Sequence, residues 1–509
     1  MYILLLFIIV MLGLVMSAGF YYGPSFLNGG DNYIYSQQAY IASHGNFSKL
    51  ANQNADDTKY IIFIGTALFY NQQFGYSRLT ISIFGILCFL LTIMVIFLIG
   101  SALYDERAGL LAGFLYSIFP LALMNATNVG DDIPMVFLLS VAVLLVVLAY
   151  KRKSRQGLIL FLAGFIGMIN YLTVSEASLG LIFVSIVVLA LFLLKRIKLT
   201  GLVSFAVGVA IAILLILLIS RAFDHSYTYI FDIYNQAYTI WWAGQVPVQG
   251  FHYYLMTMFI TRAQANPVHM DYYNDGTAFG YIGWLLLASL IYLAVAREKR
   301  ALLPGFWVLF AFLYLSFGSQ SLTKYVPLQF ENRFLLILCP AIMLTISFAI
   351  VSLYDRIKSR SIKTVALCAI TIVLIAITAS SIWTASYTLT SQYFWSEPLM
   401  QLNNFVNTLP TNAQIVTYGS YPWYLYSNYQ HDTSTIYGPQ FSGGGCNVQM
   451  GFQNGEYIIG NFSPQLEQCG LQPVFQPKMP GWLENYTAFD NSPTDYWGVS
   501  VYYYNSSAT

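Results

Sequence analysis

Eleven long apolar runs restrict the fold of this chain more than any other feature. An α-helix of about 20 residues, at roughly 1.5 Å per residue, crosses the hydrocarbon core of a bilayer. The runs lie at about 3–20, 79–100, 107–124, 133–150, 157–174, 177–194, 200–220, 277–296, 301–318, 333–353 and 364–384. Only 9% of the 509 residues are charged, against about 25% in soluble globular proteins. The sequence therefore predicts an α-helical polytopic membrane protein with about eleven transmembrane helices.

Basic clusters follow alternate apolar runs and indicate the orientation of the chain. They are "KRKSR" at 151–155, "KRIK" at 195–198, "REKR" at 297–300 and "DRIKSR" at 355–360. The stretches that lie on the same side of the membrane as these clusters hold 15 of the 23 Lys and Arg residues but only 4 of the 22 Asp and Glu residues. Because Lys and Arg mark the cytoplasmic side, we expect a cytoplasmic N-terminus in a prokaryotic cell membrane. The first run has no basic residues before it and no small-residue cleavage site, so we expect a retained span.

Three large pieces then lie on the outer side: the loops 21–78 and 221–276, which belong to a transmembrane domain 1–384, and the segment 385–509. In this last segment apolar runs shorten and turn residues appear, which predicts a separate extracytoplasmic domain of mixed α/β structure. "SEPLMQLNNFVNTLP" favours a helix capped by Ser396, and "AQIVTYG" and "GVSVYYY" favour strands. Cys446 and Cys469 are plausible disulfide partners in an oxidising exterior, whereas the other three cysteines fall within spans.

Acidic residues stand at the outer ends of several spans, where a charge needs water, a partner or a function. In "NATNVGDDIPMVFLL", Asp132 is placed to cap the following span, which leaves Asp131 to face a polar cleft. Asp31 follows the first span and is placed to cap a short helix over 32–43, a role that does not exclude catalysis. For Glu176 we expect a capping role together with Ser175.

Basic residues are scarce on the outer side, which has eight of the 23. Arg333 stands at the edge of the tenth span, where it could reach the interface, pair with Glu331, or clamp a phosphate with its bidentate guanidinium. Lys324 and Arg78 are further candidates for binding a substrate phosphate.

Four passages resemble the C-type (GT-C fold) glycosyltransferases, a multi-span family that includes protein O-mannosyltransferases and lipid A aminoarabinose transferases. The passages are "GGDNYIYSQQAYIASHG", "YIIFIGTALFYNQQFGYSRLTIS", "LYDERAGLLAGFLYSIFPLALMNATNVGDDIPMVF" and "ENRFLLILCPAIML". The likeness covers roughly residues 20–345 and the general plan of spans followed by an outer domain.

This resemblance implies an enzyme that moves a sugar from a polyprenyl or dolichyl phosphate to a protein, lipid or glycan acceptor on the outer membrane face. It implies that Asp31 is the catalytic or metal-binding carboxylate, although the family often has a second acid where this chain has Asn32. Asp131 and Asp132 match the later acidic motif, and Arg333 matches a candidate phosphate ligand. A divalent metal ion between Asp31 and Asp131 stays open.

Other functions remain as alternatives. Oligosaccharyltransferases share the fold, but their Trp-Trp-Asp motif is missing from 385–509, which favours transfer of a single hexose or pentose. A transporter would carry its charges near the bilayer midplane in repeated, broken helices, whereas here they lie at span ends. An envelope protein without enzymatic activity would leave the acidic residues without a role. Nothing in the sequence indicates a nucleic-acid partner.

The orientation can be tested by cysteine labelling from outside the cell. We expect a membrane-impermeant reagent to label Gly130→Cys but not Lys153→Cys, because residue 153 lies in a basic cluster. The reverse pattern would move the acidic residues to the cytoplasmic face and overturn the topology.

Overall fold

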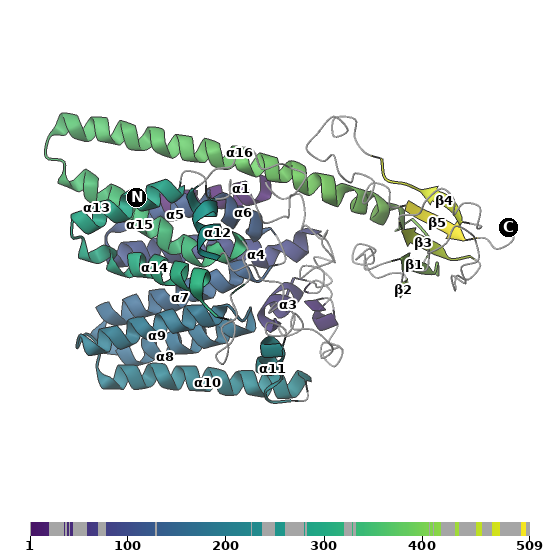
Figure 1. Cartoon of the computed structure of the whole chain (residues 1–509), viewed down its shortest axis with the longest axis horizontal. Coiled ribbons are helices and arrows are strands. Elements are labelled where there is room, and N and C mark those ends of the chain that lie inside the picture. Colours follow the sequence, from purple (N-terminus) through teal and green to yellow (C-terminus); the bar gives the residue numbers. More distant parts are fainter. Residues whose placement is uncertain are drawn as a thin grey trace.

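The computed structural model is mostly helical, with a helical bundle and a small sheet at one end of it (Figure 1). It describes residues 2–19, 35, 38–39, 41–43, 59–69, 78–127, 130–224, 226–236, 250–259, 279, 282–319, 328, 332–406, 408–410, 412–418, 433–436, 455–460, 471–478 and 500–504.

The bundle consists of helices that coincide with all eleven predicted spans. They are α1 (Tyr2–Gly19), α4 (Arg78–Leu103), α5 (Glu106–Ser117), α6 (Pro120–Ala126), α7 (Asp132–Lys151), α8 (Gln156–Ile169), α9 (Ala177–Leu193), α10 (Leu199–Asp224), α13 (Ile282–Val295), α14 (Leu302–Phe317), α15 (Cys339–Arg356) and α16 (Arg360–Val406). Short helices α3 (Tyr60–Ala67), α11 (Tyr229–Gln236) and α12 (Gly250–Phe259) join them.

Within the described residues, seven helices are long and apolar enough to cross a membrane, or eight if one bent pair counts as a single span. α1, α9 and α13 are shorter apolar helices. The polytopic helical architecture is therefore confirmed, while the number of eleven crossings stays a prediction.

The bent pair is the run expected as one straight helix over 107–124. α5 and α6 instead meet at an angle of 63°. Pro120 is the first residue of α6, and Phe119 before it is extended, with ψ of 119°. A proline disfavours helical geometry in the residue before it and cannot donate a hydrogen bond to the preceding turn. The helix therefore breaks at Phe119 and Pro120.

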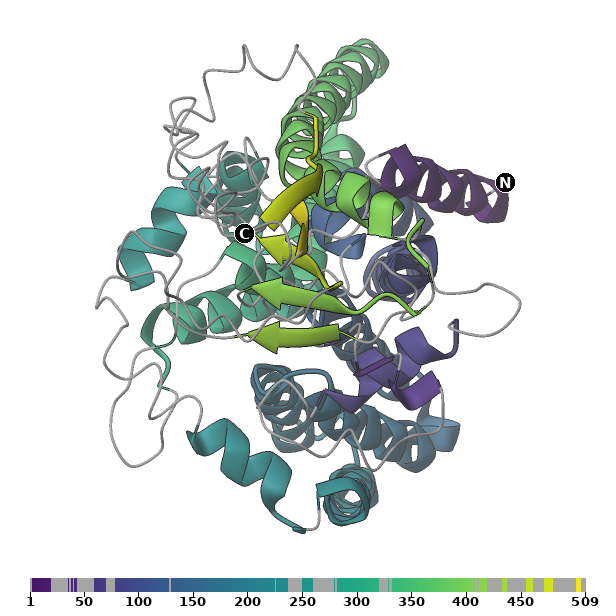
Figure 2. The same ribbon diagram turned by 90° about the vertical axis from the view of Figure 1, so that its right-hand side faces the viewer.

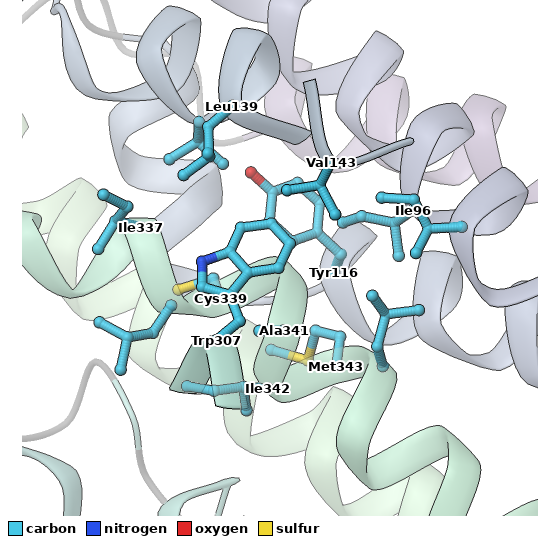
Figure 3. Close-up of a cluster of buried hydrophobic side chains, with 14 of the residues drawn as sticks. Ile96, Tyr116, Leu139, Val143, Trp307, Ile337, Cys339, Ala341, Ile342 and Met343 are labelled. Atoms are coloured by element: carbon cyan, nitrogen blue, oxygen red, sulfur yellow. The ribbon is translucent and has the colours of Figure 1, made fainter. Parts of the chain in front are cut away.

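α15 is the most enclosed of the spans, with 94% of its apolar window buried. Trp307 of α14 and Tyr116 of α5 lie against it, and Leu139 and Val143 of α7 border the same cluster (Figure 3). A helix that is apolar on all sides is suited to such a central place. Immediately before α15 lies a seven-residue 3₁₀ segment, η9 (Asn332–Leu338), which carries Arg333 at its start.

α16 is a single helix of 47 residues, about 70 Å long at 1.5 Å per residue, and it connects the bundle to the sheet (Figure 1). The helix predicted from Ser396 onward is therefore confirmed as far as Val406, but its predicted start is wrong, because Ser396 and Pro398 lie inside α16 rather than at its N-terminus. The expected boundary between residues 384 and 385 also falls within this helix.

The sheet has five strands in the order β2-β1-β3-β5-β4 and lies over one end of the bundle (Figure 2). The strands are β1 (Ile415–Tyr418), β2 (Thr433–Ile436), β3 (Tyr457–Gly460), β4 (Leu471–Phe475) and β5 (Ser500–Tyr504). β1 is parallel to β2 and β3, and β5 is antiparallel to β3 and β4. The two predicted strands are β1 and β5, so the mixed α/β character is confirmed.

The end of α16 covers one face of the sheet. Leu402 and Val406 of α16 pack with Ile415, Ile459 and Val501 of three strands. This apolar contact joins the sheet to the same helix whose first part, Arg360–Ile382, is long and apolar enough to cross a membrane.

Glycines allow close approach between helices of the bundle. A Cβ on Gly208 of α10 would lie 2.1 Å from the backbone oxygen of Phe161 in α8, and one on Gly164 of α8 would lie 2.3 Å from the backbone oxygen of Phe205. Lipid tails are as apolar as the side chains, so helices in a membrane associate largely through such close packing.

This packing predicts that Gly208→Ala destabilises the protein. The methyl group would overlap backbone rather than a movable side chain, so we expect a loss of about 1–3 kcal/mol in the free energy of unfolding, measured by thermal unfolding in detergent. Gly305→Ala is the control, because its nearest neighbour is a side-chain atom at 3.8 Å. Equal stability of both variants would contradict the tight α8–α10 contact.

Candidate active site

The candidate site lies at the end of the bundle nearest the sheet, where three elements begin. Lys59 immediately precedes α3, Asp131 and Asp132 stand at the start of α7, and Arg333 is the second residue of η9. α3 can be seen at this end in Figure 1. The basic cluster 151–155 lies at the other end of α7, and the cluster 355–360 lies at the other end of α15.

Asp131 is the centre of the site. Its Oδ2 accepts a charge-assisted hydrogen bond from Lys59 Nζ at 2.6 Å and a hydrogen bond from the Tyr35 hydroxyl at 3.3 Å. Lys59 Nζ also donates to the Tyr35 oxygen. Asp131 is 2% exposed, Lys59 4% and Tyr35 0%. The lysine and aspartate therefore form an ion pair that is almost entirely removed from water.

Arg333 approaches both adjacent carboxylates. Its Nη1 lies 3.8 Å from Asp131 Oδ1 and 3.9 Å from Asp132 Oδ2. These distances are longer than a direct hydrogen bond, so Arg333 forms ion pairs with the two carboxylates at these atoms without hydrogen-bonding them. With 19% of its side chain exposed, Arg333 is the more accessible of the two cations, and Lys59 is the enclosed one.

The two cations set the ionisation of Asp131. Burial alone would raise its pKa, but the positive charges of Lys59 and Arg333 and the hydrogen bond from Lys59 hold the pKa below its ordinary value. Asp131 is therefore a carboxylate at neutral pH and a weak proton acceptor.

Hydrogen bonds from neighbouring helices hold the end of α6 and the first turn of α7 in place. Ser82 of α4 donates to the carbonyl oxygen of Thr127 at 2.6 Å, and Asn170 at the end of α8 donates to the carbonyl oxygen of Met135 at 3.0 Å. The Met135 amide in turn bonds the Asp131 carbonyl at 3.0 Å. The carboxylate pair is thus built on rigid helix ends rather than on a free loop.

Of the residues selected from the sequence, Asp131, Asp132 and Arg333 come together. Asp31, Lys324, Cys446 and Cys469 lie outside the described residues, so their roles stay predictions. Arg78 begins α4, but its side chain also lies outside what the structure describes.

The predicted capping roles are wrong. Asp132 is the first residue of α7 rather than its cap, and the residue at the cap position, Asp131, makes no capping hydrogen bond because its carboxylate faces Lys59. Glu176 likewise precedes α9 without capping it, and its carboxylate accepts from the Ser175 hydroxyl at 3.0 Å instead.

Lys59 was missed as a site residue. The only signal was that it is one of eight basic residues on the outer side, and its partner Asp131 is 72 positions away.

A metal site is not formed by the described residues alone, among which no group of three or more His, Cys, Asp or Glu side chains could hold an ion. Asp131 also faces two cations, which reduces the negative charge that would attract a divalent metal. The binding of a metal between Asp31 and Asp131 stays a prediction.

The buried pair predicts a strong effect of removing one partner. We expect Lys59→Met to lower the free energy of unfolding by about 3–5 kcal/mol, because a buried carboxylate loses its closest cation. Lys59→Met combined with Asp131→Asn should cost less than the sum of the two single changes, since they contact each other. Thermal unfolding in detergent measures both, and Lys358→Met at an exposed position is the control. Strict additivity would contradict the ion pair.

One family pattern matches part of the chain. Residues 58–220 match the family model described as dolichyl-phosphate-mannose-protein mannosyltransferase, a segment that includes Lys59, Asp131 and Asp132 but ends before Arg333. A comparison with curated proteins found no match.

Solved structures resemble the chain over most of its length. ArnT from Cupriavidus metallidurans in the apo state has a TM-score of 0.60 and 11% identity, covering 97% of each chain. The same protein bound to undecaprenyl phosphate has a TM-score of 0.61 and 12% identity, covering 98% of this chain and 97% of that one. The oligosaccharyltransferase of Archaeoglobus fulgidus tethered with an acceptor peptide has a TM-score of 0.50 and 13% identity, covering 92% of this chain and 70% of that one. The chain therefore has the GT-C fold of these multi-span glycosyltransferases.

Proposed function

We propose that this protein is a membrane glycosyltransferase that moves a sugar from a polyprenyl- or dolichyl-phosphate donor to a hydroxyl-bearing acceptor. The proposal rests on one observation: Lys59 and Arg333 both lie beside Asp131 at one end of the bundle, and Asp131 forms an ion pair with each of them. Arg333, the more exposed of the two cations, lies 3.8 Å from this carboxylate, and its guanidinium is suited to an anionic oxygen group such as a phosphate.

The chemistry of transfer fits these residues. Attack of the acceptor oxygen on the anomeric carbon breaks the bond from that carbon to a phosphate oxygen, and negative charge builds up on the departing lipid phosphate. Arg333 and Lys59 stabilise this charge, and their fixed positions avoid reorganisation during the reaction. Lys324 and Arg78 are proposed as further phosphate ligands from their position in the sequence.

The carboxylates take different roles in this proposal. Asp131 is a poor base because its pKa is lowered, so its role is to position the two cations. Asp31 remains the proposed general base, and it would take the proton of the acceptor. Asp132 lies in the first turn of α7, where it supports Arg333.

The family match and the fold support a lipid-linked donor. The matching family is named for dolichyl-phosphate-mannose, and one structural neighbour is bound to undecaprenyl phosphate. Because dolichyl-phosphate-mannose carries one sugar, the family match favours transfer of a single sugar over transfer of an oligosaccharide. The acceptor class, whether protein, lipid or glycan, stays open.

We place the site on the outer face of a prokaryotic cell membrane, with the N-terminus in the cytoplasm. The basic clusters at the opposite helix ends support this orientation through the positive-inside rule. The sheet domain over the site would then be extracytoplasmic, and the bundle 1–384 and the segment 385–509 are proposed as the two domains.

The proposal is tested by turnover of a polyprenyl-phosphate sugar by purified variants. We expect Asp31→Asn to slow transfer by roughly a hundredfold or more, because general-base assistance contributes about 10²–10⁴ in rate. Asp132→Asn should be milder, and Asp131→Asn should fall between them. Arg333→Gln should weaken donor binding about tenfold or more, since a charged hydrogen bond contributes about 1.5–3 kcal/mol.

Lys358→Gln at the opposite end of the bundle is the control for lost positive charge and should leave donor binding unchanged. Thermal unfolding of each variant separates an effect on the site from an effect on folding. Near-normal turnover in Asp31→Asn would remove that residue from the mechanism, and unchanged donor binding in Arg333→Gln would remove the phosphate site.

A further inference from the structure

Seven basic residues gather at the end of the bundle away from the sheet, in and beside the connections from α13 to α14 and from α15 to α16 (Figure 1). We call this set the basic turn surface, and its members are Arg297, Lys299, Arg300, Arg356, Lys358, Arg360 and Lys363. All of them except Lys363 are exposed. They lie at the opposite end of the bundle from the candidate active site, so the proposed mechanism uses none of them.

Two hydrogen bonds join the two connections into one surface. Arg356 Nη2, at the end of α15, donates to the carbonyl oxygen of Ala296 after α13 at 3.0 Å. The hydroxyl groups of Tyr292 in α13 and Ser352 in α15 lie 3.3 Å apart. Both contacts link positions that are 60 residues apart in the chain. The basic residues therefore form one patch rather than two independent charge runs.

Three of the cations lie against tyrosine rings. Measured to the ring centre, the pairs are Arg300 with Tyr104 at 4.7 Å, Arg356 with Tyr292 at 5.9 Å, and Lys363 with Tyr354 at 5.3 Å. Tyrosine is enriched where a membrane protein passes through the headgroup region of the bilayer. These contacts therefore favour a position of the basic turn surface at the level of the lipid headgroups.

The acidic residues beside this surface already have partners. Glu298 Oε1 lies 3.6 Å from Arg300 Nε, and Asp355 accepts two hydrogen bonds of 2.9 Å from Arg107. Arg297, Lys299 and Arg360 form no ion pair with any acidic residue in the described part of the chain. The surface therefore has an excess of positive charge that the described residues do not neutralise.

The backbone of Arg297 gives an independent indication that its side chain is needed. Its φ is 52°, in the left-handed region, and the amide of Glu298 closes the end of α13 by donating to the carbonyl oxygen of Leu293 at 3.1 Å. Glycine is the usual residue at such a helix end, because a side chain disfavours this conformation. Attraction to the helix C-terminus is available to a basic residue anywhere in the last turn, so it does not require an arginine here.

We propose that the basic turn surface binds the phosphate group of an anionic phospholipid. Guanidinium and ammonium groups donate charge-assisted hydrogen bonds to phosphate oxygens, and basic residues beside an anionic bilayer surface add to the attraction. The inference does not depend on the proposed function.

The apolar helices beside the surface favour a bilayer lipid over a soluble anion as the ligand. Lys299–Phe317, Arg333–Arg356 and Arg360–Ile382 are each long and apolar enough to cross a membrane. Ile362 and Val365, directly after Arg360, are 56% and 68% exposed. Acyl chains can therefore lie against apolar side chains while the phosphate meets the cations.

The test is equilibrium binding of a fluorescent phosphatidylglycerol to the purified full-length protein in detergent. We expect unlabelled dioleoylphosphatidylglycerol to displace the probe, whereas dioleoylphosphatidylcholine, with the same acyl chains and no net charge, should not. Glycerol 3-phosphate, which has the phosphate without acyl chains, should not displace it either. Displacement by phosphatidylcholine would show binding through acyl chains alone, and displacement by glycerol 3-phosphate would show a site for soluble anions. Either result overturns the proposal.

The combined variant Arg297→Gln, Lys299→Gln and Arg360→Gln should weaken binding of phosphatidylglycerol about tenfold or more, because three basic residues near the lipid phosphate are lost. Arg297→Lys combined with Arg360→Lys keeps the charge and should retain most of the binding.

The matched control is Lys151→Gln, Lys153→Gln and Arg155→Gln, which removes three exposed charges from the connection between α7 and α8. We expect this variant to bind as the wild type does. Unchanged binding in the first variant, or equal weakening in the control, would show that the lipid does not bind at the basic turn surface. Thermal unfolding checks that each variant is folded, and the competition experiment on the wild type decides even where a variant is not.

Discussion

The enclosed charge of Asp131 is the constraint on which the rest of the site depends. An ionised carboxylate that is 2% exposed is tolerated only with close partners, because the loss of its hydration costs several kcal/mol. Lys59 and Tyr35 come from the segment before α4, and Arg333 comes from the segment before α15. One carboxylate therefore ties together three parts of the chain, and it brings two cations to one end of the bundle.

The position of Arg333 depends on α15, the most enclosed helix of the bundle. Arg333 is carried by η9, whose residues Leu335 to Leu338 are almost fully buried. A 3₁₀ segment of seven residues is unusually long, and it leads directly into α15, where Pro340 lacks the amide proton that would continue a regular helix upstream. The enclosure of α15 by α5, α7 and α14 (Figure 3) thus fixes the point from which the guanidinium reaches the carboxylates.

Sequence patterns predicted the helices well and the contacts between them only in part. Apolar runs reveal helices because burial in lipid imposes length and composition on each one separately. The adjacent acids and Arg333 could be selected because a charge next to a membrane span needs water, a partner or a function. Lys59 could not be selected from the sequence, because it becomes a site residue only through its contact with Asp131, 72 positions away. The continuity of α16 was missed because a Ser-x-Pro pattern is typical of a helix start, whereas here the helix runs through this pattern as far as Val406.

The same reasoning explains why two acids that both experience the charge of Lys59 differ in character. Asp131 meets Lys59 directly, and its pKa falls below its ordinary value. Burial raises the pKa of the Glu176 carboxyl, and the charge of Lys59 offsets this increase only in part. A cation therefore lowers the pKa of an enclosed acid only where its attraction outweighs the effect of burial, and of these two acids Asp131 is the one that meets this condition.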